Sequence, residues 1–370
     1  MIDLSLLPDG GMAWLEASGP GSHLVVSTRV RLARNLERHR FITRTDPAER
    51  EAILAEVEAA AGSTGGLGRA VRFRIDRLEL VDRQLLHERH LVSRELAAPE
   101  TGSRVRPGAG LLVQDRASVM VNEEDHLRLQ ALRSGFALEA TWGQVATLDT
   151  ELGQRLAFAF HPEFGYLTSC PTNVGTGLRA SVLVHLPGLV LTKEINKILQ
   201  GLTQVGLTFR GLYGEGSEVV GNLFQLSNQT TLGQTERELL DHLGKLVRQV
   251  MEYEERARQI LLRDATAIIE DKVWRAFGLL RYARTLSFEE TMNLLSGVRL
   301  GVGLGLIPNV GMYTLNKLLV FTQPAHLAAA QGRGLADEEV PIRRAAYVRQ
   351  MLEAEVGRRG SSADLPPTQG

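Results

Sequence analysis

The hydrophobic pattern of this 370-residue chain changes at Thr235, and that change restricts the fold more than any other feature. Before Thr235, short runs rich in Val, Leu and Phe are separated by loops and few helical segments, as in a sheet. After it, apolar residues recur at three- and four-residue steps, beginning with Leu239, Leu240 and Leu243, which is the spacing of amphipathic helices. We therefore expect an α+β fold: an antiparallel sheet flanked by helices, followed by an all-helical domain.

The same pattern predicts four regions along the chain. They are an N-terminal segment (1–22), a catalytic domain (23–257), a helical domain (258–356) and a disordered tail (357–370). Asp46 followed by Pro47 predicts the start of a helix that runs to about Ala61. Strands are predicted at 23–32, 70–75, 111–121, 179–186, 206–213 and 221–227, and further helices at 254–264, 265–283, 287–296, 312–321 and 338–355.

Arginine supplies most of the positive charge, and this excludes several enzyme classes. The 42 basic residues include only five lysines, and the first 192 residues contain none. A Walker A loop needs Gly-Lys before Ser or Thr, but Gly244-Lys245 precedes Leu246. A eukaryotic-type protein kinase needs an early strand lysine, which is also missing. Codon bias in a GC-rich genome accounts for most of the arginine excess, yet any phosphate site in the first half must still use arginine.

Composition also indicates where the protein works. The net charge of −1 argues against a polyanion-binding surface spread over the whole protein and leaves a local basic cluster open, so no direct nucleic-acid partner is expected. Cys170 is the single cysteine and cannot form an intramolecular disulfide, which fits a reducing cytosol. The sequence has neither the start of a signal peptide nor an uncharged apolar run of about eighteen residues. We therefore expect a cytoplasmic protein.

Two motifs resemble ligand-binding motifs but lack residues that these motifs require. The glycine-rich segment 297–308 lacks dinucleotide-binding spacing, because Leu306 stands where the last glycine belongs. Close helix packing or a bend between helices is the better interpretation. His87 and His90 form an HxxH pair without an HExxH motif or a cysteine pair, so no metal site is predicted.

Four polar clusters carry the chemistry that the sequence suggests. Taken singly, they could be a solvated basic edge, an acidic turn, a small-residue loop and a hairpin turn. Together they supply arginine forks that match phosphate oxygens and carboxylates that can hold a guanidinium. This combination favours phosphoryl transfer to a guanidino nitrogen. The clusters are STRVRLAR at 27–34, NEEDHLR at 122–128, TSCPTNVGTGLRAS at 168–181 and RGLYGEGSE at 210–218.

In this order the four strings resemble the ATP:guanido phosphotransferase, or phosphagen kinase, family over about residues 23–257. Arginine and creatine kinases carry a helical domain of about a hundred residues before the first motif, whereas here that motif starts at Ser27. They also end soon after the glycine loop, whereas this chain continues with helices. The layout therefore resembles that of the bacterial protein-arginine kinases.

The resemblance implies roles for individual residues. Glu124 and Glu215 match the carboxylates that hold the guanidinium, with Glu124 preferred as the base, and Cys170 matches the neighbouring thiol. Arginines near this thiol would favour its thiolate, which would tune the charge of the guanidinium. The cofactor would be ATP with Mg²⁺ held mainly by the nucleotide, so no protein metal ligand is expected. The ATP-binding residues would be Ser27, Thr28, Arg29, Val30, Arg31, His90, Arg128, Arg179, Ala180, Ser181, Val182, Leu183, Arg210, Gly211, Leu212, Tyr213 and Gly214.

The resemblance also implies a substrate and partners. Without the extra N-terminal domain, the pocket should admit an arginine side chain of another protein, in stress response and protein quality control. Implied partners are a heat-shock repressor, a zinc-containing activator and a Clp protease, with a homo-oligomeric enzyme. Two alternatives stay open: a kinase of free arginine or another small guanidino compound, and a non-catalytic adaptor that binds phosphoarginine.

One departure from the family pattern concerns regulation. Protein-arginine kinases often carry an RDxxRA motif that binds phosphoarginine. Here Arg344 and Ala345 fit the motif, but Val340 and Pro341 replace its first two residues. Arg344 is therefore a possible remnant of a phosphoarginine site, and we expect weak or no stimulation by phosphoarginine.

Overall fold

The computed structural model describes residues 2–3, 6–7, 11–97, 105–212 and 219–360, without the side chains of 356–360. Its strands are β1 (Val25–Arg34), β2 (Val71–Arg74), β3 (Gly110–Gln114), β4 (Ala117–Val121), β5 (Leu127–Ser134), β6 (Phe160–His161), β7 (Gly165–Tyr166), β8 (Leu178–His185), β9 (Leu207–Arg210) and β10 (Leu223–Asn228). Its helices are α1 (Pro47–Gly62), α2 (Leu80–Glu88), α3 (Arg94–Ala97), α4 (Leu138–Gly153), α5 (Pro187–Leu191), α6 (Ile195–Gln204), α7 (Glu236–Asp264), α8 (Thr266–Tyr282), α9 (Phe288–Gly303), α10 (Met312–Phe321), α11 (Pro324–Gln331) and α12 (Glu339–Gly360).

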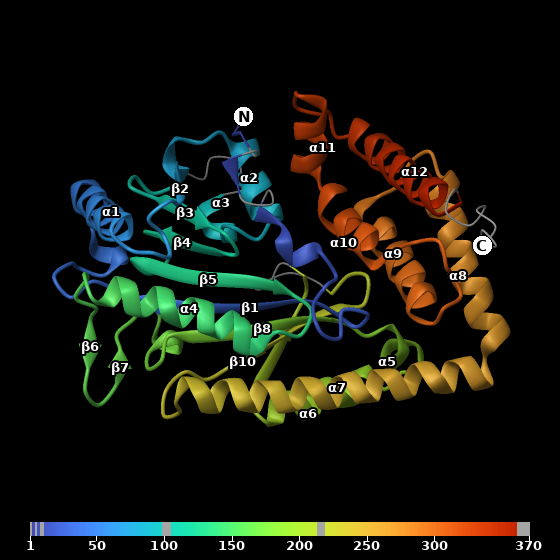
Figure 1. Ribbon diagram of the computed structural model, residues 1–370, viewed down its shortest axis with the longest axis horizontal. Coiled ribbons are helices and arrows are strands. Elements are labelled where there is room, and N and C mark those ends of the chain that lie inside the picture. The colour runs from blue at the N-terminus through green and yellow to red at the C-terminus, as the bar shows by residue number, and fades with distance from the viewer. Residues whose placement is uncertain (1, 4–5, 8–10, 98–104, 213–218, 361–370) are drawn as a thin grey trace, which may run out of the picture.

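Eight strands form one antiparallel sheet in the order β2-β3-β4-β5-β1-β8-β10-β9, with β1 near its centre. Helices α4 and α7 run beneath this sheet (Figure 1). The helical region α8–α12 stands beyond one end of the sheet and reaches toward α2. This arrangement confirms the predicted fold class.

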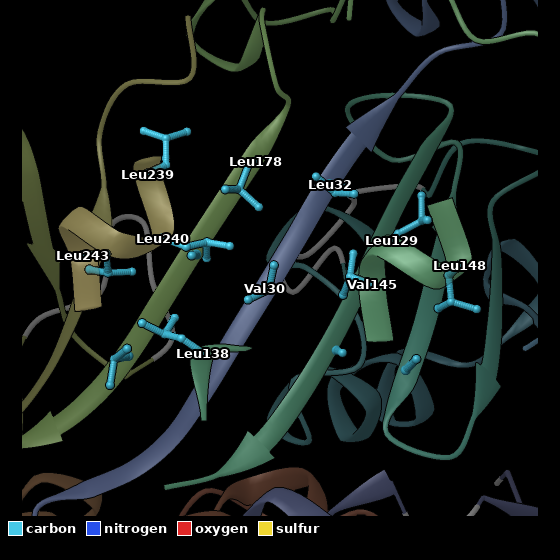
Figure 2. Close-up of a cluster of buried hydrophobic side chains, with 14 of the residues drawn as sticks. Val30, Leu32, Leu129, Leu138, Val145, Leu148, Leu178, Leu239, Leu240 and Leu243 are labelled. Carbon is cyan, nitrogen blue, oxygen red and sulfur yellow. The ribbon is translucent and has the colours of Figure 1, made fainter. Parts of the chain in front are cut away.

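Strand alternation divides the side chains of β1 between two faces. Val30 and Leu32 are fully buried in a hydrophobic core with residues of α4 and α7, as Figure 2 shows. Arg29 and Arg31 point to the opposite face. On that face the neighbouring residues become apolar toward the helical region, where Leu183 and Leu223 join a second core. One sheet face therefore has a charged half and an apolar half.

Helix α7 connects the two regions without a break. It begins with a capping box, in which Thr235 accepts from the Glu238 amide and the Glu238 carboxylate accepts from the Thr235 amide. Its 29 residues span roughly 43 Å at 1.5 Å per residue, and they cross the predicted domain boundary at 257. That boundary stays a prediction. Among the described residues, no helix is both long enough and apolar enough to cross a membrane.

Local signals in the sequence are confirmed at several elements. Asp46 caps α1 by accepting from the Glu49 amide at 2.9 Å. The glycine-rich segment 297–308 serves close packing, because a Cβ on Gly301 would lie 2.3 Å from a methyl group of Val273 in α8. The last helix, α12, extends to Gly360, beyond the expected end at 355.

Candidate active site

A cleft of about 890 Å³ lies on the charged half of the sheet face. Its walls come from β1, β5, β8, β9 and β10, from the segment at α2 and α3, and from the loop around Cys170. All four polar clusters predicted from the sequence contribute to it. Within the described part of the chain, seven arginines and three glutamates line it: Arg29, Arg31, Arg94, Arg106, Arg128, Arg179 and Arg210, with Glu95, Glu123 and Glu124.

Strand register brings the predicted phosphate-binding arginines together. Arg31 lies opposite Arg179 on β8 and Gln130 on β5, while Ala33 lies opposite Arg128. Directly opposed side chains have Cβ atoms about 5 Å apart, so like charges there are unfavourable. Burial, followed by the nearby Arg29, Arg128 and Arg179, holds the pKa of Arg31 well below its ordinary value. Arg31 Nε is buried and finds no acceptor among the described residues.

Arg29 is held by a side-chain amide. Its Nε donates to Gln130 Oε1 at 2.9 Å. Burial, with a further contribution from Arg128, lowers the pKa of Arg29 to about 10. Among the described residues that line the cleft, seven arginines thus outnumber three glutamates, and this excess of positive charge favours a bound polyphosphate.

Arg128 lies between the other arginines of the cleft and its carboxylates. Its Nη2 donates to Glu124 Oε2 at 2.6 Å and its Nε lies 3.0 Å from Glu123 Oε2. Burial would lower the pKa of Arg128, but Glu123, Glu124 and Asp125 outweigh it and raise that pKa. For Glu123, burial acts to raise the pKa, and Arg128 with two hydrogen bonds reverses it to a net lowering. Glu123 is thus the fixed counter-ion, whereas Glu124 is partly exposed in the cleft.

Cys170 shares the cleft with Glu124, and Asp125 ties the two loops together. The Asp125 carboxylate is fully buried and accepts from Asn35 Nδ2 and from the Ser169 amide, each at 2.7 Å. Cys170 follows Ser169 directly, and its sulfur lies 3.0 Å from Thr172 Oγ1. The partial exposure of Cys170 agrees with the polar surroundings seen in the sequence.

The glycines of the third cluster serve backbone packing. Gly175 has φ +110°, and a Cβ there would lie 2.2 Å from the Thr231 carbonyl oxygen. Gly177 has φ +64°, and a Cβ there would lie 2.6 Å from the Ala33 carbonyl oxygen. Any other residue would strain both positions. These glycines close the loop against β1 and the 228–232 segment, and Gly177 also lines the cleft.

His90 lines the cleft, as predicted, together with His87. Its ring packs edge-on to Trp14, with 5.1 Å between centroids. Burial and then the nearby Arg29 hold the pKa of His90 well below its usual value, so the ring is neutral. Within the described residues, no group of three or more His, Cys, Asp or Glu side chains is arranged to hold a metal ion.

In the strand segments predicted to bind ATP, only some of the side chains reach the cleft. Alternation turns Val30, Ala180 and Val182 into the core beneath the sheet. Thr28 is fully buried there, donating to the Gly135 carbonyl and accepting from the Ala137 amide before α4. Five further residues of these segments do not line the cleft: Ser27, Ser181, Leu183, Gly211 and Leu212. Of these, Leu183 and Leu212 belong to the second core.

Other predicted residues lie elsewhere. Tyr213, Gly214 and Glu215 lie outside the described residues. Arg344 lies in the helical region, where its buried guanidinium donates to the carbonyls of Thr322 at 2.8 Å and Leu286 at 3.0 Å. These bonds connect α12 to the end of α10 and to the segment before α9. Phosphoarginine binding at Arg344 stays a prediction.

Sequence reasoning missed several residues of the cleft. Glu123 stands in the acidic run and could have been found as the buried neighbour of Glu124. Gln130 does not line the cleft but accepts a hydrogen bond from Arg29, and it alternates with core residues in a segment that was not predicted as a strand. Arg94, Glu95 and Arg106 flank a segment that has no distinctive motif.

Comparison with known proteins agrees with this geometry. Residues 53–257 match the ATP:guanido phosphotransferase C-terminal catalytic domain, and residues 266–362 match the protein-arginine kinase McsB C-terminal domain. A protein-arginine kinase of Symbiobacterium thermophilum is 46% identical over 92% of this chain and 96% of its own length. The chain belongs to the protein-arginine kinase branch of the ATP:guanido phosphotransferase family. The Bacillus subtilis protein-arginine kinase is 41% identical over 95% of this chain and 96% of its own.

Two solved kinase structures share the fold. A duplicated taurocyamine kinase from Schistosoma mansoni, with bound components of a transition-state analogue, superposes with a TM-score of 0.57 at 28% identity. The superposition covers 69% of this chain and 35% of the taurocyamine kinase chain. A lombricine kinase gives a TM-score of 0.55 at 23% identity, over 68% of this chain and 70% of its own, and shows the fold alone.

Proposed function

We propose that this guanido phosphotransferase moves the γ-phosphoryl group of MgATP to the guanidino group of arginine residues in proteins. The observation that carries the proposal is the cleft itself. In it, arginines of three neighbouring strands face the same space as Glu124 and Cys170. Mg²⁺ enters as part of the substrate, bound to the phosphate oxygens.

The arginines supply the phosphate half of the reaction. Arg29, Arg31, Arg128, Arg179 and Arg210 would contact the phosphates with planar forks that lysine lacks. Their positive charge would stabilise the charge that spreads over the transferring group. His90, neutral and at the cleft wall, would contact the nucleotide.

The carboxylates supply the guanidino half. A guanidinium is protonated at pH 7, and its nitrogens are then poor nucleophiles. Glu124 and Glu215 would hold it in line with the γ-phosphorus, and the Cys170 sulfur would lie beside it. The Arg128–Glu124 contact of 2.6 Å gives Glu124 a cationic partner that a substrate guanidinium would join or replace.

Phosphoryl transfer forms one bond to the γ-phosphorus and breaks another. A lone pair on a terminal guanidino nitrogen attacks the γ-phosphorus, an N–P bond forms, and the bond from this phosphorus to the β,γ-bridging oxygen breaks. ADP leaves with that electron pair. The nitrogen loses a proton to a carboxylate, for which we propose Glu124. Phosphoarginine, ADP and a proton are the products.

The substrate is proposed from the relatives. The fold of the catalytic half is shared with kinases named for small guanidino compounds, taurocyamine and lombricine. The relatives that match nearly the whole chain at 41–46% identity carry the name protein-arginine kinase. This difference supports arginine in proteins over free arginine.

Labelled ATP offers a direct test. The enzyme is incubated with [γ-³²P]ATP and either casein or free arginine, and the products are treated with acid and with base. Acid-labile, base-stable label on casein is expected, because N–P bonds hydrolyse in acid. Label on free arginine alone would make this a metabolic phosphagen kinase, and no label would favour the non-catalytic adaptor.

We also propose, from the family resemblance, a cytoplasmic homo-oligomer that acts in stress response and protein quality control. A heat-shock repressor, a zinc-containing activator and a Clp protease would be its partners. Purified candidates test this: the repressor should gain acid-labile phosphate, and the activator should raise the rate of casein labelling. Light scattering reports the oligomeric state.

A further inference from the structure

The end of α2 faces two regions of the molecule at once. His87 and His90 line the cleft. Between them, Glu88 and Arg89 are buried against α11 of the helical region, although more than 230 residues separate them along the chain. Four consecutive residues therefore join the nucleotide side of the cleft to the helical region.

Glu88 caps α11 from outside. Its two carboxylate oxygens accept from the Ala325 amide at 2.9 Å and from the His326 amide at 3.0 Å. These are among the first amides of the helix, which have no partner within it, and Pro324 at the first position has no N–H. A carboxylate at this position also complements the helix dipole.

The His326 ring adds further hydrogen bonds between α11 and the end of α2. Arg89 Nε can only donate, and it lies 3.1 Å from His326 Nε2, so Nε2 is the acceptor. Nδ1 then carries the proton and donates to Glu88 Oε2 at 2.7 Å. Burial lowers the pKa of His326, although Glu88 opposes this, and the neutral ring satisfies both neighbours.

From this junction, hydrogen bonds lead to a phosphate-binding arginine. His90 has φ +60°, a conformation that a residue with a side chain adopts only where its surroundings hold it. The His90 carbonyl accepts from Gln130 Nε2 at 2.9 Å, and Gln130 Oε1 accepts from Arg29 Nε at 2.9 Å. Gln130 is fully buried, so its amide cannot turn to water.

We propose that Glu88 is a positioning residue, through which α11 of the helical region sets His90 and Arg29 for ATP. The proposal rests on the proposed nucleotide-binding role of the cleft. Glu88 itself does not touch the substrate. It fixes the turn at His90, and this turn fixes the Gln130 amide that orients the Arg29 guanidinium.

The test is Glu88→Gln in the full chain. Glutamine keeps the size but loses the charge and one of the two acceptors. We expect Kd and KM for MgATP to rise about five- to tenfold, with kcat within twofold and KM for casein unchanged. His326→Asn keeps a donor near the position of Nδ1 and should show a smaller rise, whereas His326→Phe, which loses that donor, should match Glu88→Gln.

The chain offers a matched control in Glu254→Gln. Glu254 is buried, as Glu88 is, and it accepts from two successive amides, Gly188 at 2.9 Å and Leu189 at 3.0 Å, beside an arginine. Its contacts lie between α5 and α7, and it does not line the cleft. The Glu254→Gln variant should lower Tm as Glu88→Gln does, but it should leave KM for MgATP unchanged.

Equal changes in KM for both glutamate variants, or none for Glu88→Gln, would overturn the proposal. If Glu88→Gln does not fold, the His326→Asn and His326→Phe pair decides, and equal KM values for the two would overturn it. Calorimetry separates this failure from failure of the proposed function. If the wild type binds MgATP and Arg29→Ala weakens binding while Glu88→Gln does not, the positioning role alone fails. Absence of MgATP binding by the wild type would overturn both.

Discussion

The two halves of one sheet face differ in what surrounds their side chains. Toward the helical region, Leu183 and Leu223 are covered by apolar helices. Toward the other end, Arg31 and Arg179 stand opposite each other, and among the described residues that line the cleft seven arginines face three glutamates. The change takes place within single strands, since Arg179 and Leu183 lie on the same side of β8. The apolar half gains its stability from the protein itself, whereas we expect the charged half to be stabilised by an anionic ligand.

The largest expected effect is the loss of catalysis in Glu124→Gln. Removing a general base lowers kcat by about 10²- to 10⁴-fold, and Glu215→Gln should have an effect of the same order. Because Arg128 keeps its ion pair with Glu123 in this variant, the free energy of unfolding in urea should change little. Glu139→Gln is the control, since Glu139 is also paired with an arginine but is well exposed on α4. Near-normal kcat in either site variant would contradict the two-carboxylate assignment.

Arg31→Met tests the charged half directly. Loss of a two-point phosphate contact should weaken MgATP binding by at least about tenfold, from roughly 1.5–3 kcal/mol for a hydrogen bond to a charged group. Relief of the repulsion from Arg29, Arg128 and Arg179 should keep the free energy of unfolding equal or raise it. Calorimetry and urea unfolding measure the two quantities. A destabilised variant that binds MgATP normally would reverse the interpretation.

Leu223→Ala is the counterpart on the apolar half. Truncating a buried leucine costs about 2–5 kcal/mol of stability, because Leu223 is nearly fully buried beneath the helical region. KM for MgATP should stay within experimental error at a temperature where the variant is folded. A rise in KM without a loss of stability would mean that the two halves are not separate.

Cys170→Ala should have a smaller effect than the glutamate variants. Loss of one hydrogen bond of about 1 kcal/mol would lower kcat about fivefold, and Cys170→Ser should recover part of it. The pH profile of kcat with casein provides the measurement. An unchanged rate would reduce Cys170 to a packing residue of its loop.

The smallest expected effect concerns phosphoarginine. The Arg344 guanidinium is buried and donates to two main-chain carbonyls, and Val340 and Pro341 replace the other motif residues. Added phosphoarginine should therefore give no saturable rise in casein phosphorylation. Saturable binding that disappears in Arg344→Lys would contradict this expectation.

Local patterns predicted much of this molecule, and non-local contacts explain the rest. The alternation in β1 separates Arg29 and Arg31 from the core, and the Asp46 cap marks the start of α1. Strand β5 was missed because Arg128 and Gln130 interrupt its apolar pattern on the cleft side. The contact of Glu88 with α11 joins segments 237 residues apart, and no local pattern encodes it. Of the residues predicted by motif to bind ATP, Val30 and Val182 have side chains that alternation places in the core, and their role in ATP binding stays a prediction.

A crystal structure with MgADP, nitrate and an arginine-containing peptide would test the central claim most directly. The ADP phosphates and the planar nitrate should lie within about 3.2 Å of nitrogens of Arg29, Arg31, Arg128, Arg179 and Arg210. The peptide guanidinium should lie between the nitrate and Glu124. Phosphates bound away from the charged half of the sheet face, or a guanidinium remote from Glu124, would contradict the account.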